Sequence, residues 1–282
     1  MFLGYNTNGL AHHDVFDAVE LLAEIGYRGV AITIDHNALP PGAGNAGRHV
    51  TQLGQLLERL AMRSVIETGA RFLLDSRAKH EPTLLSEGRR RRIDFYKYAI
   101  DCAAELGSDC VSLWSGAIRA PISREHAMDR LVEGLREVLD YAAERNVLVG
   151  FEPEPGMLIN SQRAFEELIG RIDEPNLRLT LDVGHLHCQG ETPIADVIRG
   201  WSARLANVHL DDARSGTHEH LMFGEGEIDF RPILRTLTEV GYTGGVYVEL
   251  SRHSQEGPET ARRSFQFLKN ILDKTERNTK LR

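Results

Sequence analysis

Four apolar segments in the second half of the chain each end in a side chain that can bind a metal ion. These side chains are Glu152, Asp182, His209 and Glu249. Three carboxylates and one imidazole form an oxygen-rich ligand set that suits Mn²⁺, Mg²⁺ or Co²⁺, with Zn²⁺ as an alternative, and Mn²⁺ is our first expectation. Carboxylates brought together without a cation would repel one another. The sequence therefore predicts that these four residues bind one divalent metal ion.

The segment that leads to Glu152 carries a second carboxylate, Glu154, two positions later. Side chains along a strand alternate between its faces, so both glutamates would point the same way at the carboxyl end of the strand. Glu154 is interpreted either as a support for the metal ligands or as a structural residue.

All four segments belong to an alternation of strand-like and helix-like patterns that runs along the chain. Aliphatic and β-branched runs predict strands, and apolar residues three and four positions apart predict helices. Gly26 and Gly107 follow two of the helices as C-terminal caps, and Ser123 is a typical N-cap. The expected strands are 2–5, 29–34, 64–67, 110–114, 147–151, 177–182, 205–209 and 245–249, and the expected helices are 14–25, 50–61, 90–106, 123–145, 161–172, 193–201, 230–240 and 258–273.

About eight strands and eight helices over 282 residues predict an α/β protein with a single (β/α)₈ TIM barrel, and we expect one domain across residues 1–282. A doubly wound sheet is the structural alternative, but no Gly-rich fingerprint follows the first strand. In a barrel the carboxyl ends of all strands meet at one mouth, which would bring the four ligands together. The charged tail from about Lys274 is expected to fray.

The composition argues against several classes of partner. A formal net charge of −8 disfavours nucleic acid, and the basic run Arg89–Arg92 is interpreted as a solvated helix face. No stretch approaches the roughly 20 apolar residues of a membrane span, and the first residues do not resemble a signal peptide. Three widely spaced cysteines without a CxxC pair suit a reduced, cytoplasmic protein. A homo-oligomer is compatible with all of these features.

The order of the motifs resembles the xylose-isomerase-like TIM barrels. This family includes sugar isomerases, ketose 3-epimerases, inosose dehydratases and the endonuclease IV branch. The resemblance covers essentially the whole chain, and it depends on the order and spacing of the motifs taken together. These motifs are Glu152, Leu181–His185, Asn207–Asp211, His220–Gly226 and Val248–Glu249.

The resemblance implies a role for individual residues. The four residues named first would ligate the metal. In the epimerase branch, the positions that match Glu152 and Glu249 are also the acid/base pair, and the matches of His185 and Arg214 contact substrate oxygens. The partner implied is a small-molecule carbohydrate.

Three histidines and one tryptophan carry two interpretations each. His185, His218 and His220 match the place where the endonuclease branch holds another zinc ion, with His218 standing for an aspartate. They would form either a second metal site or a polar wall that binds substrate hydroxyls, with His220 as a substrate contact. Trp114, at the end of the fourth strand, would stack on a sugar ring or pack in the core.

These residues predict a metal-dependent sugar isomerase or epimerase that removes a proton next to a carbonyl through a metal-bound enediolate. A lyase or dehydratase acting on an inosose or a 3-keto-glycoside would use the same ligands. An AP endonuclease is disfavoured because Glu67–Gly69 and Trp114–Gly116 lack the histidines of that branch. A non-catalytic carbohydrate-binding barrel is disfavoured because both acid/base candidates are present. The acidic segment Gly224–Glu227 would repel phosphate, so we expect an unphosphorylated keto-sugar or polyol.

Overall fold

Eight parallel strands hydrogen-bond side by side and close into a barrel in the order β1-β10-β7-β6-β5-β4-β3-β2. The computed structural model describes residues 1–42, 44, 46–119 and 121–280. The barrel strands are β1 (Phe2–Asn6), β2 (Gly29–Thr33), β3 (Arg63–Glu67), β4 (Val111–Leu113), β5 (Val149–Phe151), β6 (Leu177–Asp182), β7 (Leu205–Leu210) and β10 (Gly245–Val248). The predicted (β/α)₈ barrel is confirmed.

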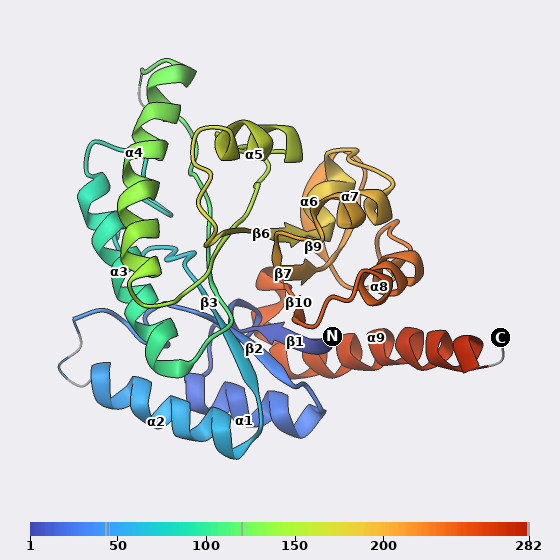
Figure 1. Cartoon of the computed structure of the whole chain (residues 1–282). Helices are drawn as coiled ribbons and strands as arrows, with labels where there is room; N and C mark the ends of the chain where they lie inside the picture. Colours follow the sequence, from blue (N-terminus) through green and yellow to red (C-terminus); the bar gives the residue numbers. More distant parts are fainter. Residues whose placement is uncertain (43, 45, 120, 281–282) are drawn as a thin grey trace.

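Helices connect the strands and cover the outside of the barrel (Figure 1). Their ends follow from local chemistry: Asp14 and Ser123 accept hydrogen bonds at helix N-termini, and Gly26 and Gly107 adopt the left-handed conformation at C-termini. The α-helices are α1 (Val15–Ile25), α2 (Ala46–Arg59), α3 (Arg89–Leu106), α4 (Arg124–Ala143), α5 (Gln162–Ile169), α6 (Val183–Cys188), α7 (Ile194–Trp201), α8 (Phe230–Glu239) and α9 (Gly257–Lys280), and the 3₁₀ helices are η1 (Thr7–Leu10) and η2 (Ser251–Glu256).

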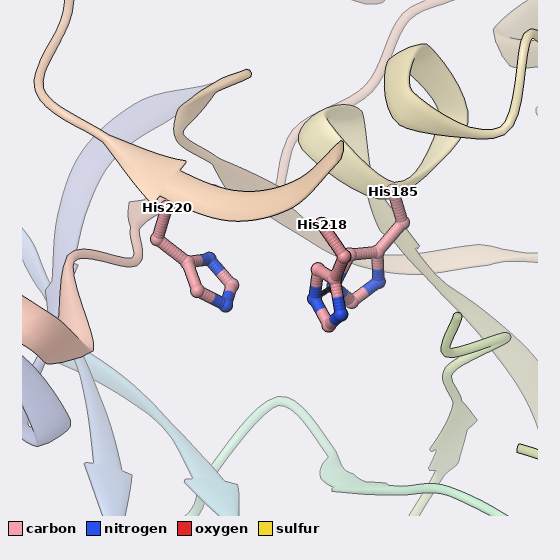
Figure 2. A group of neighbouring side chains, drawn as sticks. All are labelled: His185, His218 and His220. Carbon is pink, nitrogen blue, oxygen red and sulfur yellow. Dashed lines mark hydrogen bonds between the residues drawn. The ribbon is translucent and has the colours of Figure 1, made fainter. Parts of the chain in front are cut away.

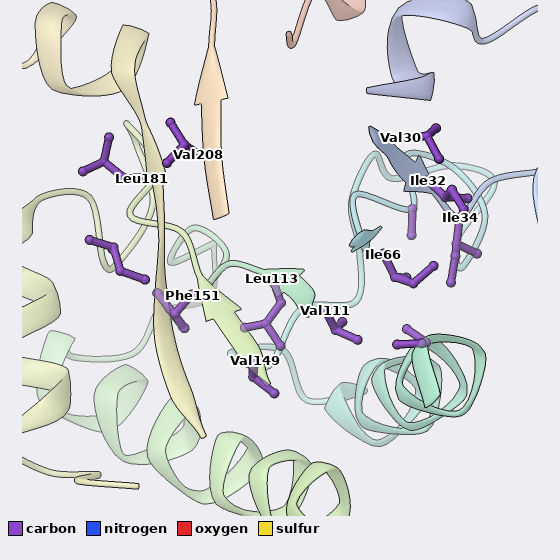
Figure 3. Close-up of a cluster of buried hydrophobic side chains, with 14 of the residues drawn as sticks. Val30, Ile32, Ile34, Ile66, Val111, Leu113, Val149, Phe151, Leu181 and Val208 are labelled. Carbon is purple, nitrogen blue, oxygen red and sulfur yellow. The ribbon is translucent and has the colours of Figure 1, made fainter. Parts of the chain in front are cut away.

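The main hydrophobic core lies between the barrel and its helices. Alternate residues of each strand point outward into this core, as Val149 and Phe151 do on β5 (Figure 3). Burial on both faces is expected for parallel strands that are covered by helices. The intervening residues point into the barrel, and they include Glu152, Asp182 and His209.

Polar contacts fill part of the barrel interior below the mouth. The hydroxyl of Ser112 on β4 lies 3.0 Å from that of Thr180 on β6. Gly150 lies on the strand between them, and a Cβ there would approach the Thr180 hydroxyl to 2.4 Å. Glycine is therefore required at this position if the Ser112–Thr180 contact is to form.

Arg92 is buried, although the run Arg89–Arg92 was expected to be a solvated helix face, and the structure differs from the sequence expectation in three further places. A short helix, α6, follows β6 without an intervening loop. The segment Asp211–Glu227, expected to be a loop, contains an antiparallel hairpin of β8 (Asp212–Arg214) and β9 (Thr217–Leu221). The last helix continues past the expected end at Asp273 to Lys280, and the remainder of the predicted tail, residues 281–282, lies outside the described residues. Among the helices described, none is long and apolar enough to cross a membrane.

Candidate active site

The four predicted metal ligands lie at the carboxyl ends of four neighbouring strands. Asp182 is the last residue of β6, and it pairs in register with His209 on β7. Glu152 directly follows β5, and Glu249 directly follows β10. Because β5, β6, β7 and β10 are consecutive around the barrel, the side chains converge from one half of its mouth.

The Nδ1 atom of His209 is the centre of this cluster. It lies 2.8 Å from Oε2 of Glu249, 3.2 Å from Oε1 of Glu152 and 3.9 Å from Oδ2 of Asp182. Each residue offers one ligand atom, and the four atoms lie within 4.8 Å of one another. The tertiary structure thus brings together all four residues chosen from the sequence.

The cluster fits a divalent cation on chemical grounds. Asp182 uses Oδ1 to cap α6, where it accepts the backbone N–H of His185 at 2.7 Å. Its Oδ2 is buried and has no hydrogen-bond partner, although buried carboxylate oxygens are normally satisfied. Three carboxylate oxygens and one imidazole nitrogen are a donor set that Mn²⁺, Mg²⁺ or Co²⁺ accepts.

The opposite edge of the His209 ring contacts a residue that the sequence analysis did not assign to the site. Nε2 of His209 lies 2.9 Å from Oε1 of Glu67, and the side-chain amide of Asn207 donates to the same oxygen at 3.0 Å. Both side chains are buried. Glu67 is the last residue of β3, and the four ligands likewise lie at or next to the carboxyl ends of their strands, so this position was the signal that could have identified it.

Glu249 is held in place by the first segment of the chain. The side-chain amide of Asn8 in η1 donates to Oε1 of Glu249 at 2.8 Å, and the backbone N–H of Asn8 donates to Oδ1 of Asn6. The Thr33 hydroxyl donates to the same Asn6 oxygen at 2.6 Å. These contacts leave Oε2 of Glu249 directed toward His209.

The two candidate acid/base carboxyls, Glu152 and Glu249, have pKa values shifted in opposite directions. Burial raises the pKa of Glu152 to about 8, although the nearby His209 opposes this shift. Burial also acts on Glu249, but the charge and hydrogen bond of His209 outweigh it and hold the pKa of Glu249 below its usual range. Carboxyls with separated pKa values are typical of acid/base pairs in enzymes.

His185, His218 and His220 form a second cluster beside the first (Figure 2). His218 and His220 come from β9 and His185 from α6, and the Nε2 atoms of His185 and His218 lie 3.1 Å apart. Nδ1 of His220 lies 2.6 Å from Oδ2 of Asp211. Burial lowers the pKa of His220, but Asp211 outweighs it and raises the pKa to about 10, whereas burial and the neighbouring imidazoles lower the pKa of His218 to about 4.

A cavity of about 300 Å³ opens above both clusters. Glu152, Glu154 and Glu249 line it, together with His218 and His220. Asp182, His185 and His209 do not line the cavity, and each is at most 5% exposed. A neighbouring cavity of about 370 Å³, between η1 and the segment after β2, is lined by none of the predicted site residues.

Trp114 and Arg214, two of the predicted substrate contacts, differ in how they lie relative to the cavity. Trp114 lines the cavity but is only 7% exposed, and its ring packs against His80 and the guanidinium of Arg92. Arg214 does not line the cavity, because its guanidinium is engaged by Glu219 at 2.9 Å and by the backbone oxygen of Glu225.

Known proteins share this architecture. The sequence model of the xylose isomerase-like TIM barrel family matches residues 19–271. An L-ribulose-5-phosphate 3-epimerase of Salmonella paratyphi A is 25% identical over 206 residues, which are 71% of this chain and 72% of that protein. An uncharacterised protein of Methanocaldococcus jannaschii is 29% identical over 167 residues, and the match spans 57% of either chain.

Solved structures agree with the fold. A D-tagatose 3-epimerase-like protein superimposes with a TM-score of 0.78 at 22% identity, covering 99% of this chain and all of that one. The IOLI protein with a bound zinc atom superimposes with a TM-score of 0.77 at 20% identity, covering 97% and 99% of the two chains. Relatives and structural neighbours therefore include sugar epimerases. Because the family match extends over most of the closed eight-stranded barrel, the chain belongs to the xylose isomerase-like TIM barrels.

Proposed function

We propose that the protein is a divalent-metal-dependent sugar isomerase or epimerase. It acts on a keto-sugar or polyol by removing a proton from the carbon next to a carbonyl. The observation that carries this proposal is the convergence of three carboxylates on Nδ1 of His209 at 2.8, 3.2 and 3.9 Å beneath a cavity of about 300 Å³. Sugar epimerases among the relatives support the same reaction class.

Glu152, Asp182, His209 and Glu249 hold the metal ion in this proposal. Mn²⁺ is the first choice, and Mg²⁺, Co²⁺ or Zn²⁺ would also fit the three oxygens and one nitrogen. When bound, a divalent cation supplies Lewis acidity, which acidifies the proton next to a coordinated carbonyl. The unpartnered Oδ2 of Asp182 supports the assignment, because a buried carboxylate oxygen is normally satisfied by a donor or a cation.

Glu152 and Glu249 serve as the acid/base pair. They extend from β5 and β10, which are separated around the barrel by β6 and β7, so they flank the cavity from two sides. One carboxylate takes the proton from the substrate carbon, and the other returns a proton to the opposite face, which inverts that carbon. Asn8 orients Glu249 through a hydrogen bond of 2.8 Å to its second oxygen.

His218 and His220 bind substrate oxygens, His185 supports them from behind the cavity wall, and the protein holds one metal ion per chain. Nδ1 of His220 lies 2.6 Å from Asp211, and His185 and His218 contact one another through their Nε2 atoms, so these nitrogens already have contacts within the protein, whereas Nδ1 of His185 has no hydrogen-bond partner among the described residues. His218 and His220 face the cavity and would hydrogen-bond to substrate hydroxyls. Three unbridged cysteines in the described residues support the expected cytoplasmic setting.

Incubation of the Mn²⁺-loaded protein with ketoses, inososes and 3-keto-glycosides in D₂O, followed by NMR, tests the function. We expect deuterium at the carbon next to the carbonyl, together with an epimer or isomer of the substrate. A lyase or dehydratase would use the same residues and release water or an aglycone after the same proton abstraction. Absence of exchange with every substrate, or equal exchange after metal removal, would contradict the proposal.

A further inference from the structure

The loop between β3 and α3 (residues 68–88) is organised by a buried arginine. Arg92 is 0% exposed, and its guanidinium donates to the backbone oxygens of Thr68, His80 and Pro82 at 3.1, 2.7 and 2.7 Å. No carboxylate of the described residues lies within 4.0 Å of the guanidinium. Cζ of Arg92 lies 5.2 Å from the centre of the Trp114 ring. A buried guanidinium that donates to three loop carbonyls, with a further side-chain contact to Tyr96, ties this loop to α3.

This loop contributes three basic side chains to the wall of the cavity above Glu152 and Glu249: Arg71, Lys79 and His80. Arg71 is paired with Asp35 at 2.7 Å, and Nδ1 of His80 lies 2.7 Å from the backbone oxygen of Gly69. Lys79 has no carboxylate within 4.0 Å among the described residues. Lys79 is therefore an unpaired cation on a loop that the hydrogen bonds of Arg92 hold in place.

A second unpaired cation lines the same cavity from another part of the barrel. Arg252 lies in η2, after β10, and its only polar contact in the described chain is a long one of 3.4 Å to the backbone oxygen of His218. Four carboxylates also line the cavity, Glu67, Glu152, Glu154 and Glu249, but none of the described carboxylates lies within 4.0 Å of Arg252. Lys79 and Arg252 both line the cavity with exposed side chains, so they attract an anionic ligand through charge that salt screens.

We propose that the substrate carries an anionic group, a carboxylate or a phosphate, which Lys79 and Arg252 bind while the keto end lies over Glu152 and Glu249. The inference rests on the proposed sugar isomerase or epimerase function and narrows its substrate class. It replaces the expectation of an uncharged sugar, which was based on the acidic segment Gly224–Glu227. That segment does not line the cavity, so its charge does not face the substrate.

Matched substrates test the inference by kinetics. A 2-ketohexose, its 6-phosphate and the corresponding 6-carboxylate are compared with the Mn²⁺-loaded enzyme by deuterium exchange in D₂O. We expect kcat/KM for one charged form to exceed that for the neutral ketose by about tenfold or more, since charge-assisted hydrogen bonds are the strong ones. The better charged form distinguishes a carboxylate from a phosphate substrate. The preference should shrink as NaCl is raised.

Variants assign the preference to the two cations. Lys79→Met and Arg252→Met should each lower the charged-to-neutral ratio of kcat/KM about tenfold, chiefly through KM, while Lys79→Arg retains most of it. Arg77→Met is the matched control, since Arg77 is an exposed cation of the same loop that does not line the cavity. Equal kcat/KM for all three substrates, or an equal loss of the ratio in Arg77→Met, would overturn the inference and leave the proposed function intact.

Binding without turnover separates the two proposals. Calorimetric titration with sorbitol, sorbitol 6-phosphate and gluconate should show tighter binding of one acid, and Lys79→Met should abolish the difference. If no sugar undergoes exchange but an acid still binds through Lys79, the proposed reaction is wrong and the anion site stands. If the three compounds bind equally, the anion site is wrong.

Discussion

Nε2 of His209 lies 2.9 Å from Oε1 of Glu67, while Nδ1 of the same ring faces Glu249 at 2.8 Å. The imidazole is thus held between a carboxylate on one edge and the proposed metal ligands on the other. A histidine that ligates a metal through one nitrogen usually donates from the other to a carboxylate or carbonyl, which sets its tautomer and orientation. Glu67 is in the position to do this for His209.

Replacement of Glu67 should weaken metal binding although Glu67 is not itself a ligand. Glu67→Gln removes the charge opposite Nε2, and loss of such an outer partner typically costs about 10–100-fold in metal affinity. Calorimetric titration of the metal-free variant with Mn²⁺ measures this directly. Glu58→Gln, at an exposed position on α2, is the control. An unchanged dissociation constant in Glu67→Gln would show that Glu67 is structural only.

Replacement of either proposed acid/base residue should reduce turnover strongly. Glu152→Gln and Glu249→Gln keep the size of each side chain but cannot accept a proton, so kcat for deuterium exchange should fall by about 10²–10⁴-fold. Metal binding has to be measured alongside, because both residues are also proposed ligands. The exposed Glu225→Gln serves as the comparison and should behave as the wild type. Wild-type kcat in either active-site variant would remove that residue from the mechanism.

Metal binding should stabilise the folded protein. The four ligands come from strands that assemble only in the closed barrel, so the unfolded chain offers no comparable site. Mn²⁺ at 100 times its dissociation constant should add about 2.7 kcal/mol to the free energy of unfolding. Melting temperatures with EDTA and with Mn²⁺ test this, and elemental analysis should find one ion per chain. If elemental analysis instead finds two tightly bound ions, and the second is lost in His218→Asn, the three histidines form a second metal site.

Arg92 should contribute to stability although no carboxylate of the described residues pairs with it. Arg92→Met leaves three loop carbonyls without a donor, and we expect a loss of about 2–4 kcal/mol in the free energy of unfolding. Urea denaturation of the two proteins gives the difference. Arg91→Met changes the exposed neighbour on the same helix and should have little effect. A neutral result for Arg92→Met would mean that the loop is held by other contacts.

His80 should make the protein less stable as the pH falls. Burial lowers the pKa of His80 to about 4, from the usual value of 6.5. Between pH 6.5 and 4 the unfolded chain binds a proton at this residue that the folded chain does not, so stability decreases as the pH falls through this window. His80→Gln should therefore show a weaker pH dependence of unfolding between pH 4 and 6.5 than the wild type. Parallel pH profiles for the two proteins would rule out this assignment.

Much of the fold was predictable from local patterns. Aliphatic runs and helical spacing indicated every barrel strand, and the caps at Gly26, Gly107 and Ser123 lie where the sequence placed them. Propensity and capping act over a few residues, so they can be read along the chain. The hairpin of β8 and β9 was missed, and Asp212 at its start also accepts the backbone N–H groups of Gly224 and Gly226 at 2.8 and 3.0 Å, contacts that local propensity does not indicate.

The ligand set could be chosen from the sequence, because each member closes an apolar strand with a metal-binding side chain. The residues that orient those ligands could not be chosen from the sequence. Glu67 and His209 are 142 positions apart, and Asn8 and Glu249 are 241 apart. Such contacts exist only because the strands close into a ring, which brings strand ends together regardless of their distance along the chain. The sequence by itself determined which residues could bind a cation, and the closed barrel decided which residues orient them and that Lys79 and Arg252, rather than Arg214, face the cavity.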